Sequence, residues 1–181
     1  MPFDDFNGAG MAGSFRFLRV AATAVVALLA LAGCDPQRIS ELEEGVASEA
    51  DVRARFGEPE KIWDAPGGGR IFEYNRNPSG HKNYMITIGV DGKMSALRQV
   101  LNPENFARIV PGMMMEDVRK TLGKPMKQVT YQVKNETAWD WRYMQPPNTS
   151  MVFTVWFNPD YRVLRTGTAP DAEATENRGG P

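Results

Sequence analysis

Residues 51–59 read DVRARFGEP, and residues 117–125 read DVRKTLGKP. Each stretch has the apolar spacing of a short helix that stops at a glycine, with a proline two residues beyond it. A duplicated helix stop of this kind indicates an internal repeat, and a repeat decides the whole fold rather than one element of it.

The matches continue on both sides of these stretches. Before them, Ile39-x-x-Leu42-x-x-Gly45 recurs as Phe106-x-x-Ile109-x-x-Gly112. After them, Ile86-Thr87-Ile88 recurs as Phe153-Thr154-Val155, and Leu97-Arg98 as Leu164-Arg165. The offset is 66 or 67 residues throughout. An ordered series of matches at nearly constant spacing predicts a tandem duplication.

Each copy predicts two helices followed by four strands. The first helix covers residues 39–44 or 106–110 and ends near a glycine. The second covers residues 48–56, where Ser48 and Asp51 resemble a capping box, and its counterpart has Met115, Val118 and Leu122 at helical spacing. Alternating strands are expected at 60–64, 70–75, 84–90 and 93–100, and at 126–134, 137–144, 150–157 and 161–166. We therefore predict an α+β fold of two tandem ααββββ repeats, each with a helix pair packed on one face of an antiparallel sheet.

The N-terminus has the features of a secretion signal. The apolar run 20–32 is shorter than the roughly 20 residues that a membrane-spanning helix needs, and Arg16 and Arg19 precede it. It ends in residues 31–34, Leu-Ala-Gly-Cys, which resemble the bacterial lipobox. This resemblance implies cleavage after residue 33, a diacylglyceryl group on Cys34 and acylation (palmitate) of the new amino terminus. The alternative is an ordinary signal peptide followed by an unmodified thiol, but Cys34 is the sole cysteine and has no partner for an internal disulfide.

Other signals concern processing, sorting and partners. A start at Met11 would give a cleaner signal peptide, because Asp4 and Asp5 are unusual in a basic n-region. Asp35 resembles the enteric signal that retains lipoproteins at the inner membrane, so the inner and the outer membrane are both candidate sites for the anchor. The net charge of −1 gives no indication of nucleic-acid binding. Residues 168–181 are rich in Gly, Pro, Ala, Thr and charges, which predicts a disordered tail.

A family resemblance enters with the order of these motifs. A lipobox, a short helix, Asp-Val-x-x-x-Phe/Leu-Gly-x-Pro, an aromatic strand and a terminal hairpin resemble the SmpA/OmlA (BamE-like) domain of small outer-membrane lipoproteins. The doubled form is similar to the tandem arrangement of β-lactamase inhibitor proteins. The resemblance implies a first repeat at 34–102 and a second at 103–167, after a signal peptide at 1–33. It also implies a protein-binding role in outer-membrane β-barrel protein assembly or envelope integrity.

The sequence offers little catalytic chemistry. His81, the one histidine, lies in a polar stretch that predicts an exposed loop. Clustered histidines, cysteines or carboxylates at metal-ligand spacing are missing, and the glycines at 67–69 lack the lysine and the helix of a phosphate loop. We therefore predict a non-enzymatic protein with no metal, no cofactor and no small-molecule substrate.

Two groups of residues are candidates for partner binding. Alternation places Phe153, Val155 and Phe157 toward the helices, so that Trp156 and Thr154 share the opposite face of the strand. Tryptophan is enriched at interface hot spots, although the other repeat could instead cover this face. Met113 and Met114 form part of a methionine run, which is either core packing or an adaptable binding surface.

The leading functional hypothesis is a lipid-anchored envelope protein at the periplasmic face of the outer membrane of a Gram-negative bacterium. Its expected partner is the outer-membrane β-barrel assembly machinery. An alternative is a periplasmic inhibitor or sensor module that captures a soluble enzyme or peptide on its sheet face. An envelope hydrolase is a third reading, which requires a carboxylate pair in a deep pocket.

Overall fold

The computed structural model describes residue 39 and residues 41–176, with side chains up to Ala174. The predicted signal peptide, the lipidated Cys34 and Asp35 lie outside the described residues. The chain divides into one unit that ends at Glu41 and a second that begins at Leu42, and the second holds both repeats. Among the described residues, no helix is both long and apolar enough to cross a membrane.

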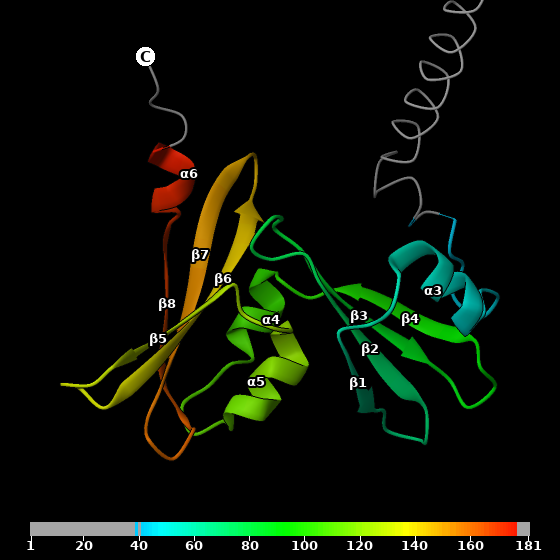
Figure 1. Cartoon of the computed structure of the whole chain (residues 1–181), viewed down its shortest axis with the longest axis horizontal. Coiled ribbons are helices and arrows are strands. Elements are labelled where there is room, and N and C mark those ends of the chain that lie inside the picture. The colour runs from blue at the N-terminus through cyan, green and yellow to red at the C-terminus, as the bar shows by residue number, and fades with distance from the viewer. Residues whose placement is uncertain (1–38, 40, 177–181) are drawn as a thin grey trace, which may run out of the picture. The chain divides into compact units, whose positions relative to one another are not determined.

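The first repeat contains one helix and a four-stranded antiparallel sheet, which we call sheet one (Figure 1). Its strands follow one another in chain order, and the helix packs on one face through Val52 and Phe56. The elements are α3 (Glu49–Phe56), β1 (Lys61–Asp64), β2 (Arg70–Asn75), β3 (Asn83–Ile88) and β4 (Met94–Gln99).

The second repeat repeats this plan with longer strands. Its helices α4 and α5 pack on one face of a second four-stranded antiparallel sheet, sheet two, around Trp139, Trp141, Phe153, Val155 and Phe157. The elements are α4 (Pro103–Ala107), α5 (Met115–Leu122), β5 (Lys127–Tyr131), β6 (Glu136–Gln145), β7 (Thr149–Phe157), β8 (Val163–Pro170) and α6 (Ala172–Glu176). The predicted α+β fold of two helix-and-sheet units is confirmed.

The duplicated stretch forms the helices that it predicts. Ser48 caps α3 through the expected capping box with Asp51, whereas Met114 stands at the cap of α5 without a side-chain hydrogen bond. Both helices stop at a glycine with positive φ, +83° at Gly57 and +78° at Gly123. At Gly123 there is also a steric reason, because a Cβ would lie 2.5 Å from the Asn75 side chain.

The first helix of each copy departs from the prediction. Within the expected 39–44 helix, Ile39 is helical but residues 41–44 are turn or irregular. Glu44 and Gly45 contact β4 instead: the Gly45 N–H donates to the Met94 carbonyl at 2.7 Å, and the Glu44 carboxylate accepts from the Leu97 N–H. In copy two the helix is α4, earlier than the predicted 106–110, because Asn102 caps it and Pro103 starts it.

The predicted disordered tail is wrong over its described part, residues 168–176. β8 continues to Pro170, and α6 follows. Asp171, between them, is buried and accepts hydrogen bonds from the side chains of Arg142 and Ser150. Composition predicts disorder from the shortage of apolar residues, but here charged and polar contacts hold the segment.

The repeat register changes by two residues after β2 and β6. Tyr74 pairs with Tyr84, whereas the corresponding Trp141 pairs with Phe153, so the second hairpin is two residues longer. The counterparts of Ile86 and Ile88 are therefore Val155 and Phe157, not the residues two positions earlier that the sequence match indicates.

This register also affects two single residues. The counterpart of Trp156 is Thr87, because both stand at the bulge of the third strand. Val90, the last residue of the strand predicted at 84–90, is 80% exposed because β3 ends at Ile88 and Val90 belongs to the following turn.

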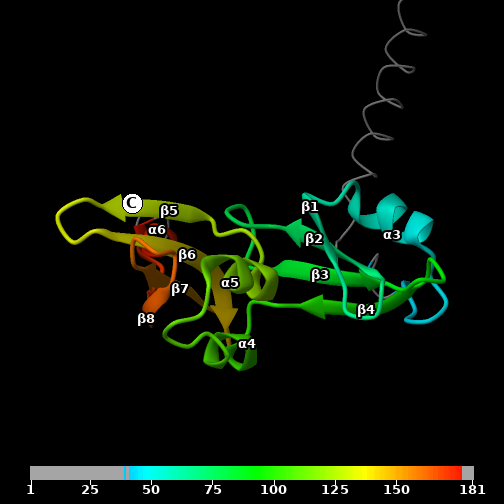
Figure 2. The same ribbon diagram turned by 90° about the horizontal axis from the view of Figure 1, so that it is seen from below.

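Helix α5 contacts both sheets. One side of it, with Val118 and Leu122, belongs to the core of sheet two. Arg119 and Lys124, at and just beyond its C-terminal end, contact β2 of sheet one. Figures 1 and 2 show α5 between the two sheets, while α3 covers the other face of sheet one.

Candidate functional site: a bare sheet face and a pocket between the repeats

We call the face of sheet one that points away from α3 the inner face of sheet one. At its centre the Glu73 side chain is fully buried. Its carboxylate accepts from the Trp63 indole (3.0 Å), from the Lys124 backbone N–H (2.9 Å) and from Arg119 (3.3 Å). Because two of these donors belong to the second repeat, Glu73 joins sheet one to the end of α5.

Asn83 completes this junction. Its side chain is fully buried, and its Nδ2 donates to the carbonyls of Leu122 (2.9 Å) and Lys124 (3.2 Å) at the end of α5. These carbonyls have no partner within the helix, so the amide acts as a cap supplied by the first repeat. The inner face of sheet one is therefore occupied by the second repeat.

We call the face of sheet two that points away from α4 and α5 the outer face of sheet two. Trp156 lies at its centre, partly exposed, between Ala138 on β6 and Arg165 on β8. Its ring lies over Gly167, where a Cβ would be 3.1 Å from the indole. No group in the described part of the chain accepts a hydrogen bond from its Nε1, which is thus available to a partner.

Charged neighbours hold Trp156 in place. The Arg165 guanidinium lies over the indole, 4.7 Å from the ring centroid, and donates two hydrogen bonds to Glu136, of 2.9 and 2.7 Å. The hydrogen bond from Arg165 lowers the pKa of Glu136, so the pair stays ionised at neutral pH. Beside it, the Thr154 hydroxyl donates to Asp140 at 2.7 Å. Trp156 is thus a single aromatic side chain whose polar neighbours are paired with one another.

The methionines lie elsewhere. Met113 and Met115 pack against the helix-side core of sheet two, opposite to Trp156, and the Met113 carbonyl accepts from the Val163 N–H at 2.9 Å. Met114 is 37% exposed at the cap of α5. The structure thus brings Trp156 and Thr154 together and places Met113 and Met114 on the other side of the sheet.

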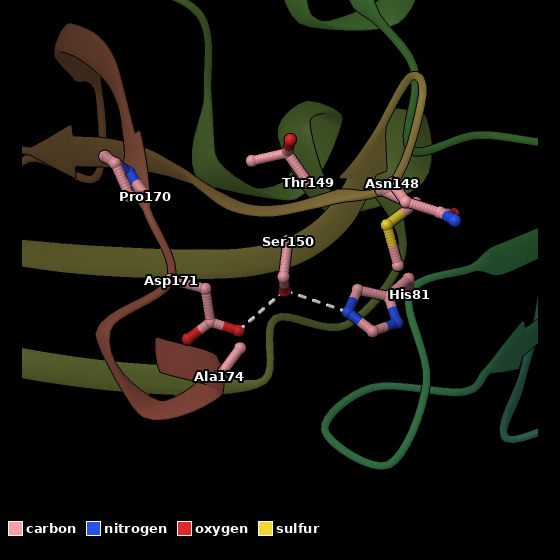
Figure 3. Close-up of a pocket in the computed structure, with 8 residues that line it drawn as sticks. His81, Asn148, Thr149, Ser150, Pro170, Asp171 and Ala174 are labelled. Atoms are coloured by element: carbon pink, nitrogen blue, oxygen red, sulfur yellow. Dashed lines mark hydrogen bonds between the residues drawn. The ribbon is translucent and has the colours of Figure 1, made fainter. Parts of the chain in front are cut away.

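A pocket of about 440 Å³ lies where the loop between β2 and β3 meets the end of sheet two. Figure 3 shows Ser150 between His81 and Asp171: the hydroxyl donates to Asp171 at 2.8 Å and lies 2.9 Å from His81 Nε2. His81 is half-buried here, so the expectation of an exposed loop histidine is wrong. Its loop is held against the second repeat instead of facing solvent.

Arg142 ties the same loop to the C-terminal segment. Its guanidinium donates to the Pro78 carbonyl at 3.0 Å and pairs with Asp171 and Glu173. Burial raises the pKa of Asp171, but the hydrogen bonds from Arg142 and Ser150 outweigh it and lower the pKa below its usual value. Burial, and then the charge of Arg142, lower the pKa of His81 below 6.5.

This arrangement does not resemble an activated serine. The Ser150 proton is directed to Asp171, so His81 must donate its Nε2 hydrogen to the hydroxyl. A general base would need that nitrogen unprotonated. Within the described residues, no three His, Cys, Asp or Glu side chains form a group that could hold a metal ion.

The sequence analysis missed the residues that join the repeats. Glu73 and Arg142 stand in strands, where their charge predicts solvent exposure, but each side chain contacts the other repeat: Glu73 accepts from Arg119, and Arg142 donates to the Pro78 carbonyl. Asn83 directly precedes the strand predicted at 84–90, where a polar residue is ordinary, and its burial depends on the carbonyls that the second repeat supplies.

Comparisons with known proteins give similarities of different weight. Two solved structures are similar at TM-scores that are too low to show a shared fold. One is a DUF4309 family protein (YjgB) from Bacillus subtilis subsp. subtilis str. 168, with 20% identity, TM-score 0.29, and coverage of 72% of this chain and 82% of that chain. The other is a putative beta-lactamase inhibitor protein from Streptococcus mutans, with 11% identity, TM-score 0.30, and coverage of 68% and 82%.

A search of curated proteins finds no match. Residues 99–167 match the family model of the outer membrane protein assembly factor BamE domain, so the resemblance inferred from the sequence is confirmed for the second repeat.

Proposed function

We propose that this chain is a lipid-anchored protein of the Gram-negative envelope that binds other proteins through the outer face of sheet two. The observation that carries this proposal is the partly exposed Trp156 on that face, in the repeat that matches the BamE domain. An indole whose N–H bonds to no described residue, set in a rim of paired charges, has the character of an interface hot spot. Because the family match names an outer membrane protein assembly factor, we assign the protein to the support of outer-membrane β-barrel protein assembly or envelope integrity.

We further propose that Cys34 carries the lipid and holds the protein at the periplasmic face of the outer membrane. Several acyl chains give stable anchoring, since each buried methylene contributes about 0.8 kcal/mol. Cys34→Ser should abolish palmitate labelling and release the protein from membranes. Fractionation of the wild type decides between the two membranes, because Asp35 resembles a signal for inner-membrane retention.

The binding proposal is tested by detergent pull-down of the full chain from native membranes, with identification by mass spectrometry. Components of the β-barrel assembly machinery should be recovered with the wild type and reduced at least about tenfold with Trp156→Ala, as expected for a hot-spot tryptophan. The control is Val133→Ala, because Val133 is fully exposed in the hairpin between β5 and β6. Equal recovery with Trp156→Ala would refute the binding face, and a soluble enzyme as the one partner would favour an inhibitor or sensor.

The pocket lined by His81 and Ser150 does not favour an enzyme. Its polar atoms bond to one another across the two repeats, which makes it a structural junction. We therefore keep the proposal of a non-catalytic protein. Loss of partner recovery with Ser150→Ala, with folding intact, would instead assign a functional role to the pocket.

A further inference from the structure

The outer edge of β8 bonds to Gly112 and Met113 at Val163, and the part of the edge beyond it lies beside Trp156. The Asp171 N–H donates to the Ser150 carbonyl at 3.0 Å, which fixes the hydrogen-bonding phase of β8 on β7. Every second residue from Asp171 back, including Gly167, then pairs inward with β7. The N–H and C=O groups of Thr166 and Thr168 therefore point outward. No described residue accepts a hydrogen bond from either N–H.

The corresponding edge of sheet one is closed. Leu97 is the counterpart of Thr166, since it pairs with Ile86 as Thr166 pairs with Val155. The Leu97 N–H donates to the Glu44 carboxylate at 3.0 Å. Hydrogen bonds from Arg98 and from this N–H lower the pKa of Glu44, so the carboxylate acceptor persists at neutral pH.

The second repeat has lost this closing group. Glu44 directly precedes Gly45, and the residue that directly precedes the matching Gly112 is Pro111. Proline has no side-chain acceptor, so nothing from this position can reach Thr166. Between Thr166 and Ala169 the edge also carries no charge and no proline, the devices that usually prevent strand pairing. The other edge, β5, carries Lys127.

We propose that the β8 edge at Thr166 and Thr168 receives an extended segment of a partner protein as an additional antiparallel strand. The surroundings specify its pattern. A side chain opposite Gly167 meets the Trp156 ring, which favours an apolar residue. Side chains opposite Thr166 and Thr168 lie beside hydroxyl groups, which favours polar residues.

The partner is thus an uncharged segment in which apolar and polar residues alternate. This is the pattern of a transmembrane β-strand, one face of which meets lipid and the other the barrel lumen. The inference rests on the proposed function, because it identifies the client strand as what the outer face of sheet two binds. It adds that backbone hydrogen bonds, and not Trp156 alone, hold the client.

The test uses the full chain in detergent and a labelled, capped peptide of three valines alternating with three threonines between terminal lysines. Binding is followed by fluorescence anisotropy. In the antiparallel arrangement the peptide residues opposite Thr166 and Thr168 are threonines, and their N–H groups point at β8. N-methylation of the threonines should weaken binding at least about tenfold, whereas N-methylation of the valines should change it by less than about twofold.

Protein variants give the complementary measurement. Thr166→Pro with Thr168→Pro removes both outward N–H groups without touching the ladder to β7, and should also weaken binding at least about tenfold. The matched control, Thr166→Val with Thr168→Val, keeps both N–H groups and should bind as the wild type. If the proline variant fails to fold, the two N-methylated peptides still test the proposal, because they are measured with the wild-type protein.

Several results would overturn strand addition: no binding of the peptide, equal loss with both N-methylated peptides, or full binding by the proline variant. Failure of this inference differs from failure of the proposed function. If membrane pull-down is lost with Trp156→Ala but kept with the proline variant, the face binds its partner by side chains and the edge is not used. If the peptide binds through its threonine amides but partner recovery in the membrane pull-down is unchanged by Trp156→Ala, strand addition stands and the assembly role does not.

Discussion

Each repeat carries one tryptophan on the sheet face that points away from its own core, and the two side chains have opposite fates. Trp63, on the inner face of sheet one, is 8% exposed: its indole donates to buried Glu73, and Lys61 and Lys120 lie 3.9 and 5.3 Å from its ring. Trp156, on the outer face of sheet two, has the Arg165 guanidinium over its ring, and its N–H bonds to none of the residues that the structure describes. The same plan thus yields one covered face and one open face.

The difference shows what the duplication achieves. A single unit of this type leaves one sheet face without a helix. In this chain the end of α5 occupies that face of the first repeat, so the first repeat supports the second. The second repeat is left with the free surface, and it is also the part of the chain that matches the BamE domain.

The largest effect should come from Glu73, the buried carboxylate at the centre of the inner face of sheet one. Glu73→Ala removes the acceptor of Arg119 and of the Trp63 indole, and one of the two acceptors of the Lys124 N–H, so we expect a loss of about 3–5 kcal/mol in the free energy of unfolding. The counterpart in sheet two is Asp140, which accepts one hydrogen bond, from Thr154. Asp140→Ala should therefore cost about 1 kcal/mol. If urea unfolding gave the same loss of unfolding free energy for both variants, the inner face of sheet one would be no more covered than the outer face of sheet two.

A smaller effect is expected from exchanging a second matched pair. Asn83 and Val152 are counterparts, because Asn83 pairs with Asn75 in sheet one and Val152 pairs with Arg142 in sheet two. Each of the two can therefore be exchanged for the residue type of the other. Asn83→Val removes the donor to the Leu122 and Lys124 carbonyls and should cost about 1–3 kcal/mol. Val152→Asn places an amide on the outer face of sheet two and should cost less than about 1 kcal/mol. A larger loss from Val152→Asn would show that this face is covered.

The junction should also respond to pH, by a smaller amount. Burial and the charge of Arg142 lower the pKa of His81, so the folded state favours the neutral ring more than the unfolded state does. The stabilisation that neutral His81 contributes to the folded state is therefore complete above pH 6.5. It is lost as the pH falls below 6.5 toward the lower pKa of His81 in the folded state. Unfolding free energies of wild type and His81→Gln, measured from pH 7.5 to pH 5, should converge toward the acid end. A constant difference would contradict the assigned ionisation.

The sequence predicted the elements of each repeat but not the way in which the repeats meet. The helix stops and the strand alternation follow from local patterns, and the structure has them in place. Trp156 was placed on the correct face because alternation along one strand is local as well. The match of residues 86–88 to residues 153–155 was two residues out of register, because a longer hairpin changes the register without altering a short sequence match.

Long-range contacts escaped the sequence for a different reason. Asp171 and Arg142 lie 29 residues apart, and only the folded sheet brings the carboxylate and the guanidinium together. The order of the segment after β8 depends on that pair, so composition alone predicted disorder. The same holds for Glu44, which lies 53 residues before Leu97 in the chain and closes the edge of β4.

The smallest change tests the two tryptophans directly. Trp156→Phe should lower the free energy of unfolding by about 1 kcal/mol or less, because the residue is partly exposed and its indole N–H has no partner among the described residues. It should nevertheless remove the component of the fluorescence that acrylamide quenches most strongly, since Trp63, Trp139 and Trp141 are at most 9% exposed. Trp63→Phe should do the opposite: it removes the hydrogen bond to Glu73, costs about 1–3 kcal/mol and leaves the quenchable component unchanged. If quenching follows Trp63 instead, the open face belongs to the first repeat and the comparison is reversed.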